Sequence, residues 1–70
     1  MMKEFELNGT EYIELNKLMK LLRFVGSGGE ANQWIDSGEV MVNDEVETRR
    51  RRKLRPEDKV VFQGNSVVVK

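Results

Sequence analysis

The 70-residue sequence predicts a single α+β domain, with two short helices packed on a small, mostly antiparallel sheet of four to five strands. Apolar residues recur at helical spacing in residues 17–37, and they alternate with polar residues before and after that stretch. No linker or repeat divides residues 1–70, and a chain of this length has room for one thin core. These observations together predict one domain over the whole sequence.

The N-terminal residues show the alternation that is typical of short strands. Phe5 and Leu7 alternate with polar residues, and Gly9-Thr10 then provides a turn. Ile13 and Leu15 alternate again, which predicts a short strand or an extended entry into the first helix.

A first helix is predicted over residues 17–24, with Asn16 as its N-cap. Apolar residues recur every three or four positions in and just after this segment. They are therefore expected to face the core: Leu18, Leu21, Leu22 and Val25.

The second helix has the clearest local signal in the sequence. Ser27 followed by Glu30 matches the capping box, in which each side chain accepts a backbone N–H that the helix start leaves free. The helix is expected to run to Ser37, and Gly38 provides the left-handed stop. Its apolar face is formed by Ala31, Trp34 and Ile35. A lone Trp on such a face usually belongs to the core, and the alternative is that it stacks on a base.

A first hairpin is predicted just after Gly38. Val40 and Val42 alternate around one residue, and Asn43-Asp44 turns the chain. A three-residue loop sets Val42 opposite Val46 and keeps the apolar face continuous, so it is favoured over a two-residue loop.

A second hairpin is predicted at the C-terminal end, after a turn at Pro56-Glu57-Asp58. Its strands are residues 59–63 and 66–69, and Gly64-Asn65 forms the tight turn. This register pairs residues 60, 61 and 62 with residues 69, 68 and 67.

Composition excludes several classes of function. The sequence contains no cysteine and no histidine, so Ser27, Ser37 and Ser66 have no histidine partner for catalysis and no metal site of the usual zinc type is available. No phosphate-binding Gly-rich motif ends in Lys-Ser or Lys-Thr. We therefore expect no enzymatic activity, no metal and no cofactor.

No apolar run approaches the roughly 20 residues of a membrane span, which makes the cytoplasm the expected location.

Charge is distributed unevenly although the net charge is zero. Residues 1–48 contain four basic and ten acidic residues, whereas residues 49–70 contain eight basic and two acidic residues. This separation predicts one positively charged face.

The basic run is the main candidate for binding. It consists of Arg49, Arg50, Arg51, Arg52 and Lys53, and Arg55 extends it. Guanidinium groups pair with phosphate oxygens and stack on exposed bases, which favours RNA as the ligand. The alternative is a solvated loop that Asp44, Glu45 and Glu47 partly neutralise, and an extended run would send alternate side chains in opposite directions.

Further candidates lie on the helices. Lys17 and Lys20 follow one flank of the first helix and are either RNA contacts or solubilising surface. The N–H groups at Ser27-Gly28-Gly29 suit a phosphate oxygen, whereas the simpler interpretation is a helix cap. Asn43 is included as a possible RNA contact, although a role in the turn is favoured.

Residues 13–62 resemble the RNA-binding domain of ribosomal small-subunit protein four, the S-four domain. The matching positions are Ile13-x-Leu15, Leu18, Leu21-Leu22, Ser27, Ala31, Ile35, Gly38-x-Val40-x-Val42-Asn43 and Asp58-x-Val60. The resemblance implies an αL-type RNA-binding motif and a small stand-alone bacterial protein. This sequence differs from the family pattern at two positions. The family often has arginine at the position of Gly28 and usually has glycine at the position of Asp44.

These observations, together with the resemblance, predict a non-catalytic monomer that binds structured RNA, either ribosomal or transfer RNA. The ribosome is one expected place of association. The basic run and the start of the second helix are the expected contacts. The alternative is a protein-interaction module whose basic run docks on an acidic partner.

Overall fold

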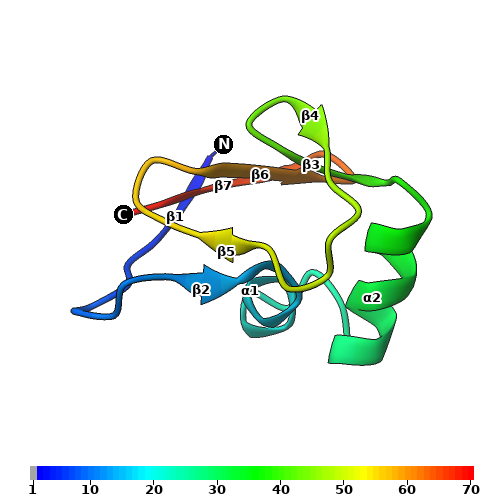
Figure 1. The fold of residues 1–70 in the computed structure, drawn as a ribbon, viewed down its shortest axis with the longest axis horizontal. Helices are drawn as coiled ribbons and strands as arrows, with labels where there is room; N and C mark the ends of the chain where they lie inside the picture. The colour runs from blue at the N-terminus through cyan, green and yellow to red at the C-terminus, as the bar shows by residue number, and fades with distance from the viewer. Residues whose placement is uncertain (1) are drawn as a thin grey trace.

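A five-stranded sheet lies over two helices and a two-stranded ribbon in the computed structural model, which describes residues 2–70 (Figure 1). In sheet order the five strands are β1 (Lys3–Phe5), β7 (Asn65–Val69), β6 (Lys59–Phe62), β3 (Val40–Val42) and β4 (Glu45–Val46). β2 (Ile13–Glu14) and β5 (Lys53–Leu54) form the antiparallel ribbon. Only the pairing of β1 with β7 is parallel, so the predicted α+β class with a mostly antiparallel sheet is confirmed.

One core joins the two layers. The fully buried side chains come from both helices, the sheet and the ribbon: Leu15, Leu18, Met19, Ala31, Ile35, Val40, Leu54, Val60, Val67 and Val69. Trp34 packs against this core, with its ring centroid 5.6 Å from that of Phe62 in an edge-on arrangement. The expectation that Trp34 packs is therefore confirmed. Neither helix of the described chain is long and apolar enough to cross a bilayer.

The first helix, α1 (Leu15–Leu21), begins and ends earlier than predicted. Asn16 is not its N-cap: Glu14 holds that position and makes no side-chain cap. The reason is tertiary, because the N–H groups of Leu15 and Asn16 donate to the carbonyls of Arg52 and Arg50, at 2.9 and 3.1 Å. A distant segment thus supplies the partners that a capping side chain provides elsewhere.

The earlier start also changes which residues of α1 face the core. Counting from Leu15, helical spacing brings Leu18, Met19 and Leu22 onto the inner face. Leu21 was expected to be buried and is 56% exposed, so that prediction is wrong. Val25 is buried as expected.

The second helix, α2 (Gly28–Asp36), confirms the predicted cap. The Ser27 hydroxyl accepts the N–H of Glu30 at 3.1 Å. The Glu30 carboxylate accepts the N–H of Gly26, one residue further back than in the usual capping box. Ser37 is the C-cap, and Gly38 stops the helix with φ of +80°.

Both predicted hairpin registers are wrong. β3 and β4 are joined by a two-residue turn in which Asn43 and Asp44 have φ of 53° and 68°, and Val46 therefore pairs with Met41. Opposite residues point to the same side of a sheet, so Val46 lies on the outer face and is 58% exposed. Short turns whose twist matches that of the strands outweigh the burial of one valine.

In the second hairpin the turn is at Gln63 and Gly64, with φ of 47° and 80°. Val60 pairs with Val67, and Phe62 pairs with Asn65. The register differs from the prediction by two residues, and an even shift keeps every side chain on its predicted face. The predicted turn after Arg55 is present, and the Asp58 N–H donates to the Arg55 carbonyl at 3.0 Å.

Candidate functional site

The basic loop, residues 49–53, forms a turn and is not extended. The N–H of Arg52 reaches the carbonyl of Arg49 at 3.3 Å, and the loop's own carbonyls accept the first N–H groups of α1. These backbone bonds place the loop over the start of α1. The arginines therefore do not point alternately to two sides, as an extended run would require.

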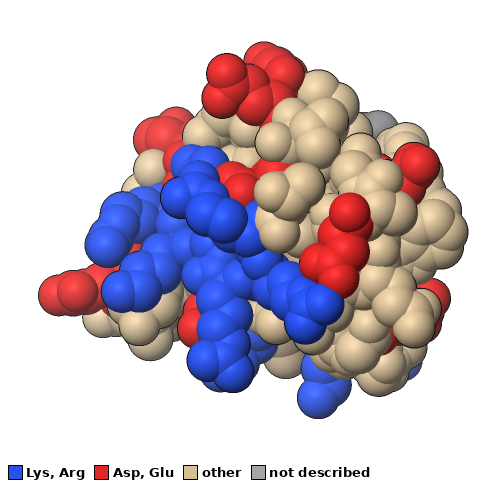
Figure 2. Space-filling view, turned by 45° about the vertical axis from the view of Figure 1, so that its right-hand side comes forward, with Lys and Arg blue, Asp and Glu red and all other residues tan. Residues whose placement is uncertain are grey.

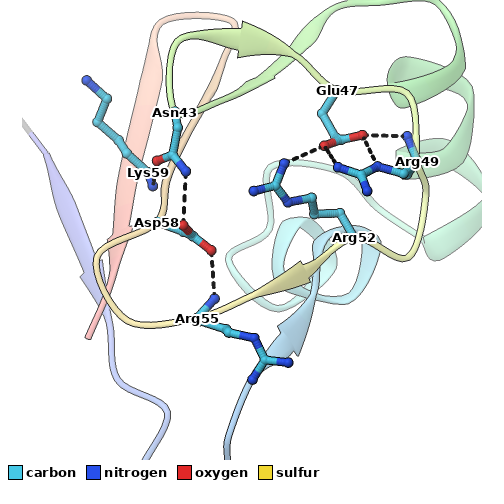
Figure 3. Close-up of polar contacts among 7 residues, drawn as sticks. All are labelled: Asn43, Glu47, Arg49, Arg52, Arg55, Asp58 and Lys59. Carbon is cyan, nitrogen blue, oxygen red and sulfur yellow. Dashed lines mark hydrogen bonds and ion pairs between the residues drawn. The ribbon is translucent and has the colours of Figure 1, made fainter.

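Glu47 is the buried acid that orders one half of the basic loop. It is 6% exposed, and its two carboxylate oxygens accept bonds from Arg49 and Arg52 (Figure 3). Arg49 donates from its backbone N–H and its Nε to Oε2, both at 2.9 Å, and Arg52 donates from a terminal nitrogen to Oε1 at 2.8 Å. The guanidinium of Arg49 is the main cause that lowers the pKa of Glu47 to about 2, and the pKa of Arg49 rises in return.

Arg50 ties the other half of the basic loop to the end of α2. Its Nε donates to Oδ1 of Asp36 at 3.0 Å, and a second guanidinium nitrogen contacts the other oxygen. This contact lowers the pKa of the Asp36 carboxyl and raises that of Arg50. Asp44 instead lies 3.6 Å from the Lys59 ammonium, so the acids that neutralise the loop are Glu47 and Asp36, and the expectation of Asp44 is wrong.

Arg51 makes no ion pair within residues 2–70 and lines two hollows. One, of about 220 Å³, lies where the basic loop, α1 and α2 meet. Its lining residues are Glu14, Asn16, Lys17, Lys20, Gly28 and Arg51, and we call it the helix hollow. The other, of about 410 Å³, is lined by Arg49, Arg51, Arg52 and Lys53.

The start of α2 opens onto the helix hollow through Gly28. As the first two helical residues, Gly28 and Gly29 have N–H groups that the helix itself leaves without partners. The Ser27 hydroxyl is occupied by the Glu30 N–H, so its capping role is confirmed. Three cations, from Lys17, Lys20 and Arg51, therefore line one small concavity together with Gly28 and a single carboxylate, that of Glu14. The excess of positive charge and the free N–H at the helix start suit an anion.

Asn43 does not join this group. Its Nδ2 donates to Asp58 at 2.9 Å, and its Oδ1 accepts the Lys59 N–H, also at 2.9 Å. Asp58 in turn accepts the N–H of Arg55 at 2.8 Å, which makes a network separate from that of Glu47 (Figure 3). Asn43 thus fastens the β3–β4 turn to the turn after Arg55.

Tyr12 is a neighbour of the basic residues that the sequence analysis did not single out. The Lys53 Nζ lies 4.9 Å from its ring centroid, and the Arg55 Cζ lies 5.6 Å from it. One sequence pattern could have identified it: side chains alternate between the two faces of an extended segment, so Tyr12, which precedes the inward-facing Ile13, is expected to face outward. Its pairing with the strand after the basic loop had no local signal.

Space-filling atoms show the combined result. In Figure 2 most of the Lys and Arg side chains on the face shown merge into one patch, with Asp and Glu side chains around its border. The uneven charge of the sequence therefore becomes one positive surface on a molecule of zero net charge.

Comparison with known proteins gives consistent matches over nearly the whole chain. The family model described as the S4 domain matches residues 5–70. YbcJ of Escherichia coli (strain K12) is 40% identical over 68 residues, 97% of each chain. The Bacillus subtilis (strain 168) protein named "Probable ribosome maturation protein RlbA" is 44% identical over 55 residues, which are 79% of this chain and 78% of the relative. The solution structure of E. coli YbcJ, described as having an αL motif involved in RNA binding, superposes with a TM-score of 0.74 at 39% identity. That superposition covers 99% of this chain and 87% of YbcJ.

Proposed function

This chain belongs to the S4 domain family, and on that premise we propose that it is a non-catalytic RNA-binding protein that recognises structured RNA. The ribosome-related name of RlbA favours ribosomal RNA over transfer RNA, and a cytoplasmic monomer is the form we propose. The proposed contacts follow the positive patch and the start of α2. They are Arg49, Arg50, Arg51, Arg52, Lys53, Arg55, Lys17, Lys20, Ser27, Gly28 and Gly29.

The helix hollow is the observation on which this proposal rests. Lys17 and Lys20 lie on α1, and Arg51 comes from the distant basic loop; the three line it together with Gly28 and Glu14. None of the three cations forms an ion pair within the described chain. Charged groups that are brought together and left unpaired favour a charged ligand, and a backbone phosphate fits the size and the donors.

Within the patch we assign the arginines two roles. Arg49, Arg50 and Arg52 fix the loop through Glu47 and Asp36, although Arg49 and Arg50 still expose most of their side chains. Arg51 is the principal phosphate contact. Asn43 is the weakest of the sequence-derived candidates, because its amide group already has partners on both sides.

The first experiment measures the affinity for a structured ribosomal RNA fragment over a range of salt. We expect log Kd to rise linearly with log salt, and Arg51→Gln to reduce the slope by about 0.7 to 0.9, the contribution of one phosphate contact. Lys70→Gln is the matched control, since it removes the same charge from the end of the chain, where Lys70 lies 3.9 Å from Glu57. A flat salt response of the wild type would contradict the proposal.

Docking on an acidic protein is the competing function, and the same assay tests it with polyglutamate in place of RNA. The proposal predicts that polyglutamate binds far more weakly than RNA at equal salt, because it lacks phosphates that fit the helix hollow. Equal or tighter binding of polyglutamate, with no effect of Arg51→Gln, would favour the protein-interaction function.

A further inference from the structure

The outer face of the β2–β5 ribbon presents an aromatic ring between cations. Ile13 pairs with Leu54, and both are buried, so their neighbours along the chain, Tyr12 and Glu14 on one side and Lys53 and Arg55 on the other, are expected to point outward. Tyr12 is 37% exposed, and its ring lies within cation–π distance of both Lys53 and Arg55. Neither cation forms an ion pair within residues 2–70, although Glu14 lies opposite Lys53 across the ribbon.

The ribbon continues the surface that leads away from the helix hollow. Arg51 borders that hollow and also the neighbouring one, and Lys53 lines the second hollow with it. Lys53 in turn reaches Tyr12. An RNA strand with one phosphate in the helix hollow can therefore follow a row of cations that ends at the exposed ring of Tyr12.

A third hollow, of about 660 Å³, adjoins this ring. Tyr12 lines it together with Glu6, Glu11 and Glu14 and one cation, Lys17. Carboxylates repel phosphates and acidic peptides, but they accept hydrogen bonds from the amino groups on base edges. The acids thus favour an uncharged base at this position, with its phosphates on the Lys53 and Arg55 side.

We propose that Tyr12 stacks on an unpaired base of the bound RNA, making the ribbon a single-strand subsite next to the helix hollow. This inference rests on the proposed function and extends it: the preferred ligand is structured RNA with an unpaired flank, and adenine or cytosine suits the acidic hollow. Aromatic rings flanked by cations are the usual means by which proteins hold unpaired nucleotides.

The test uses the full chain and three RNAs: a blunt hairpin, the same hairpin with a short adenine flank, and the same flank built from abasic nucleotides. The abasic flank keeps every phosphate and removes only the bases. For the wild type we expect the adenine flank to bind about 5- to 150-fold tighter than the abasic flank, the contribution of one stacked base.

Two variants assign this difference to the ring. Tyr12→Leu should abolish the preference for adenine over the abasic flank and leave affinity for the blunt hairpin unchanged, whereas Tyr12→Phe should keep the preference. The wild-type comparison of flanks requires no variant, so it stands even if Tyr12→Leu fails to fold.

Equal affinity of the wild type for both flanks, or an undiminished preference in folded Tyr12→Leu, would overturn the inference while blunt-hairpin binding stands. If the wild type bound none of the three RNAs, both the proposed function and this inference would be wrong.

Discussion

Glu47 shows how one buried acid shapes a basic surface. Six basic residues within seven positions repel one another, and a carboxylate that accepts four hydrogen bonds from two of them offsets part of that repulsion. From the sequence, Glu47 was expected only in the alternative of a solvated loop, as one of the acids that partly neutralise it, because a lone Glu in a polar stretch gives no signal of burial. The signal lies in the pairing of strands, since the Glu47 N–H donates to the Val40 carbonyl at the edge of the core.

The lowered pKa of Glu47 makes stability depend on pH. Its pKa falls from 4.5 in the ordinary state to about 2 in the folded protein, because Arg49 and Arg52 bind the charged form. A lowered pKa stabilises the folded state above pH 5, and this contribution disappears as the pH falls from about 4.5 toward 2. In urea unfolding at pH 7 we expect the free energy of unfolding of Glu47→Gln to be about 1–3 kcal/mol lower than that of the wild type. This difference in free energy should become much smaller by pH 3. A gap of constant size across this range would contradict the assignment.

Gly28 stands where the resemblance to the S-four domain implies an arginine. A Cβ atom at Gly28 meets no heavy atom within 4 Å, so a side chain can begin here without a clash at Cβ. We expect Gly28→Arg to bind structured RNA more tightly and with a steeper salt dependence, because it adds a cation beside Lys20 and Arg51. Gly28→Gln serves as the uncharged control. Unchanged affinity of Gly28→Arg would mean that no phosphate approaches this position.

At the scale of elements, the basic loop and α1 depend on each other. The loop gives its carbonyls to the first N–H groups of α1, and α1 thereby holds the loop where Arg51 meets Lys17 and Lys20. No local pattern predicts this exchange, which is why Asn16 was expected to be the cap. The capping box of α2 involves residues three apart in the sequence, and for that reason it was predictable.

The order of the basic loop should matter more for binding than its total charge. Glu47→Gln adds one positive charge, and electrostatics alone predicts tighter RNA binding. We expect weaker binding, because Arg49 and Arg52 lose their anchor and the loop must be ordered anew when RNA binds. Glu45→Gln is the matched control: it makes the same change in charge at an exposed position of β4 and should leave affinity equal or slightly higher. Polarisation assays at one salt concentration compare the two, and tighter binding by Glu47→Gln would contradict this role.

For the molecule as a whole, sequence pattern was enough for the fold class but not for its details. Periodicity and the signals at Ser27 and Gly38 are local, and they gave the two helices and the mostly antiparallel sheet. Hairpin registers depend on the competition between turn geometry and side-chain burial. For this reason the predicted pairing of Val46 with Val42 was wrong. The ribbon of β2 and β5 joins segments about forty residues apart, and so Tyr12 could not be placed beside Lys53 from the sequence.

Zero net charge and a strongly basic patch coexist because the chain separates its charges in space. Such a molecule has little long-range attraction for nucleic acid in general, and its binding depends on contact with the patch itself. This arrangement favours recognition of RNA shape over indiscriminate binding to any polyanion.

Backbone amide chemical shifts, recorded during titration with a structured ribosomal RNA fragment, test whether RNA binds at the helix hollow. We expect the largest changes at the amides of the helix hollow and the start of α2, namely Lys17, Lys20, Gly28, Gly29 and Arg51. The outer sheet face around Val61 and Val68 should change little. Changes concentrated on that outer face, with Gly28 and Arg51 unaffected, would contradict binding at the helix hollow.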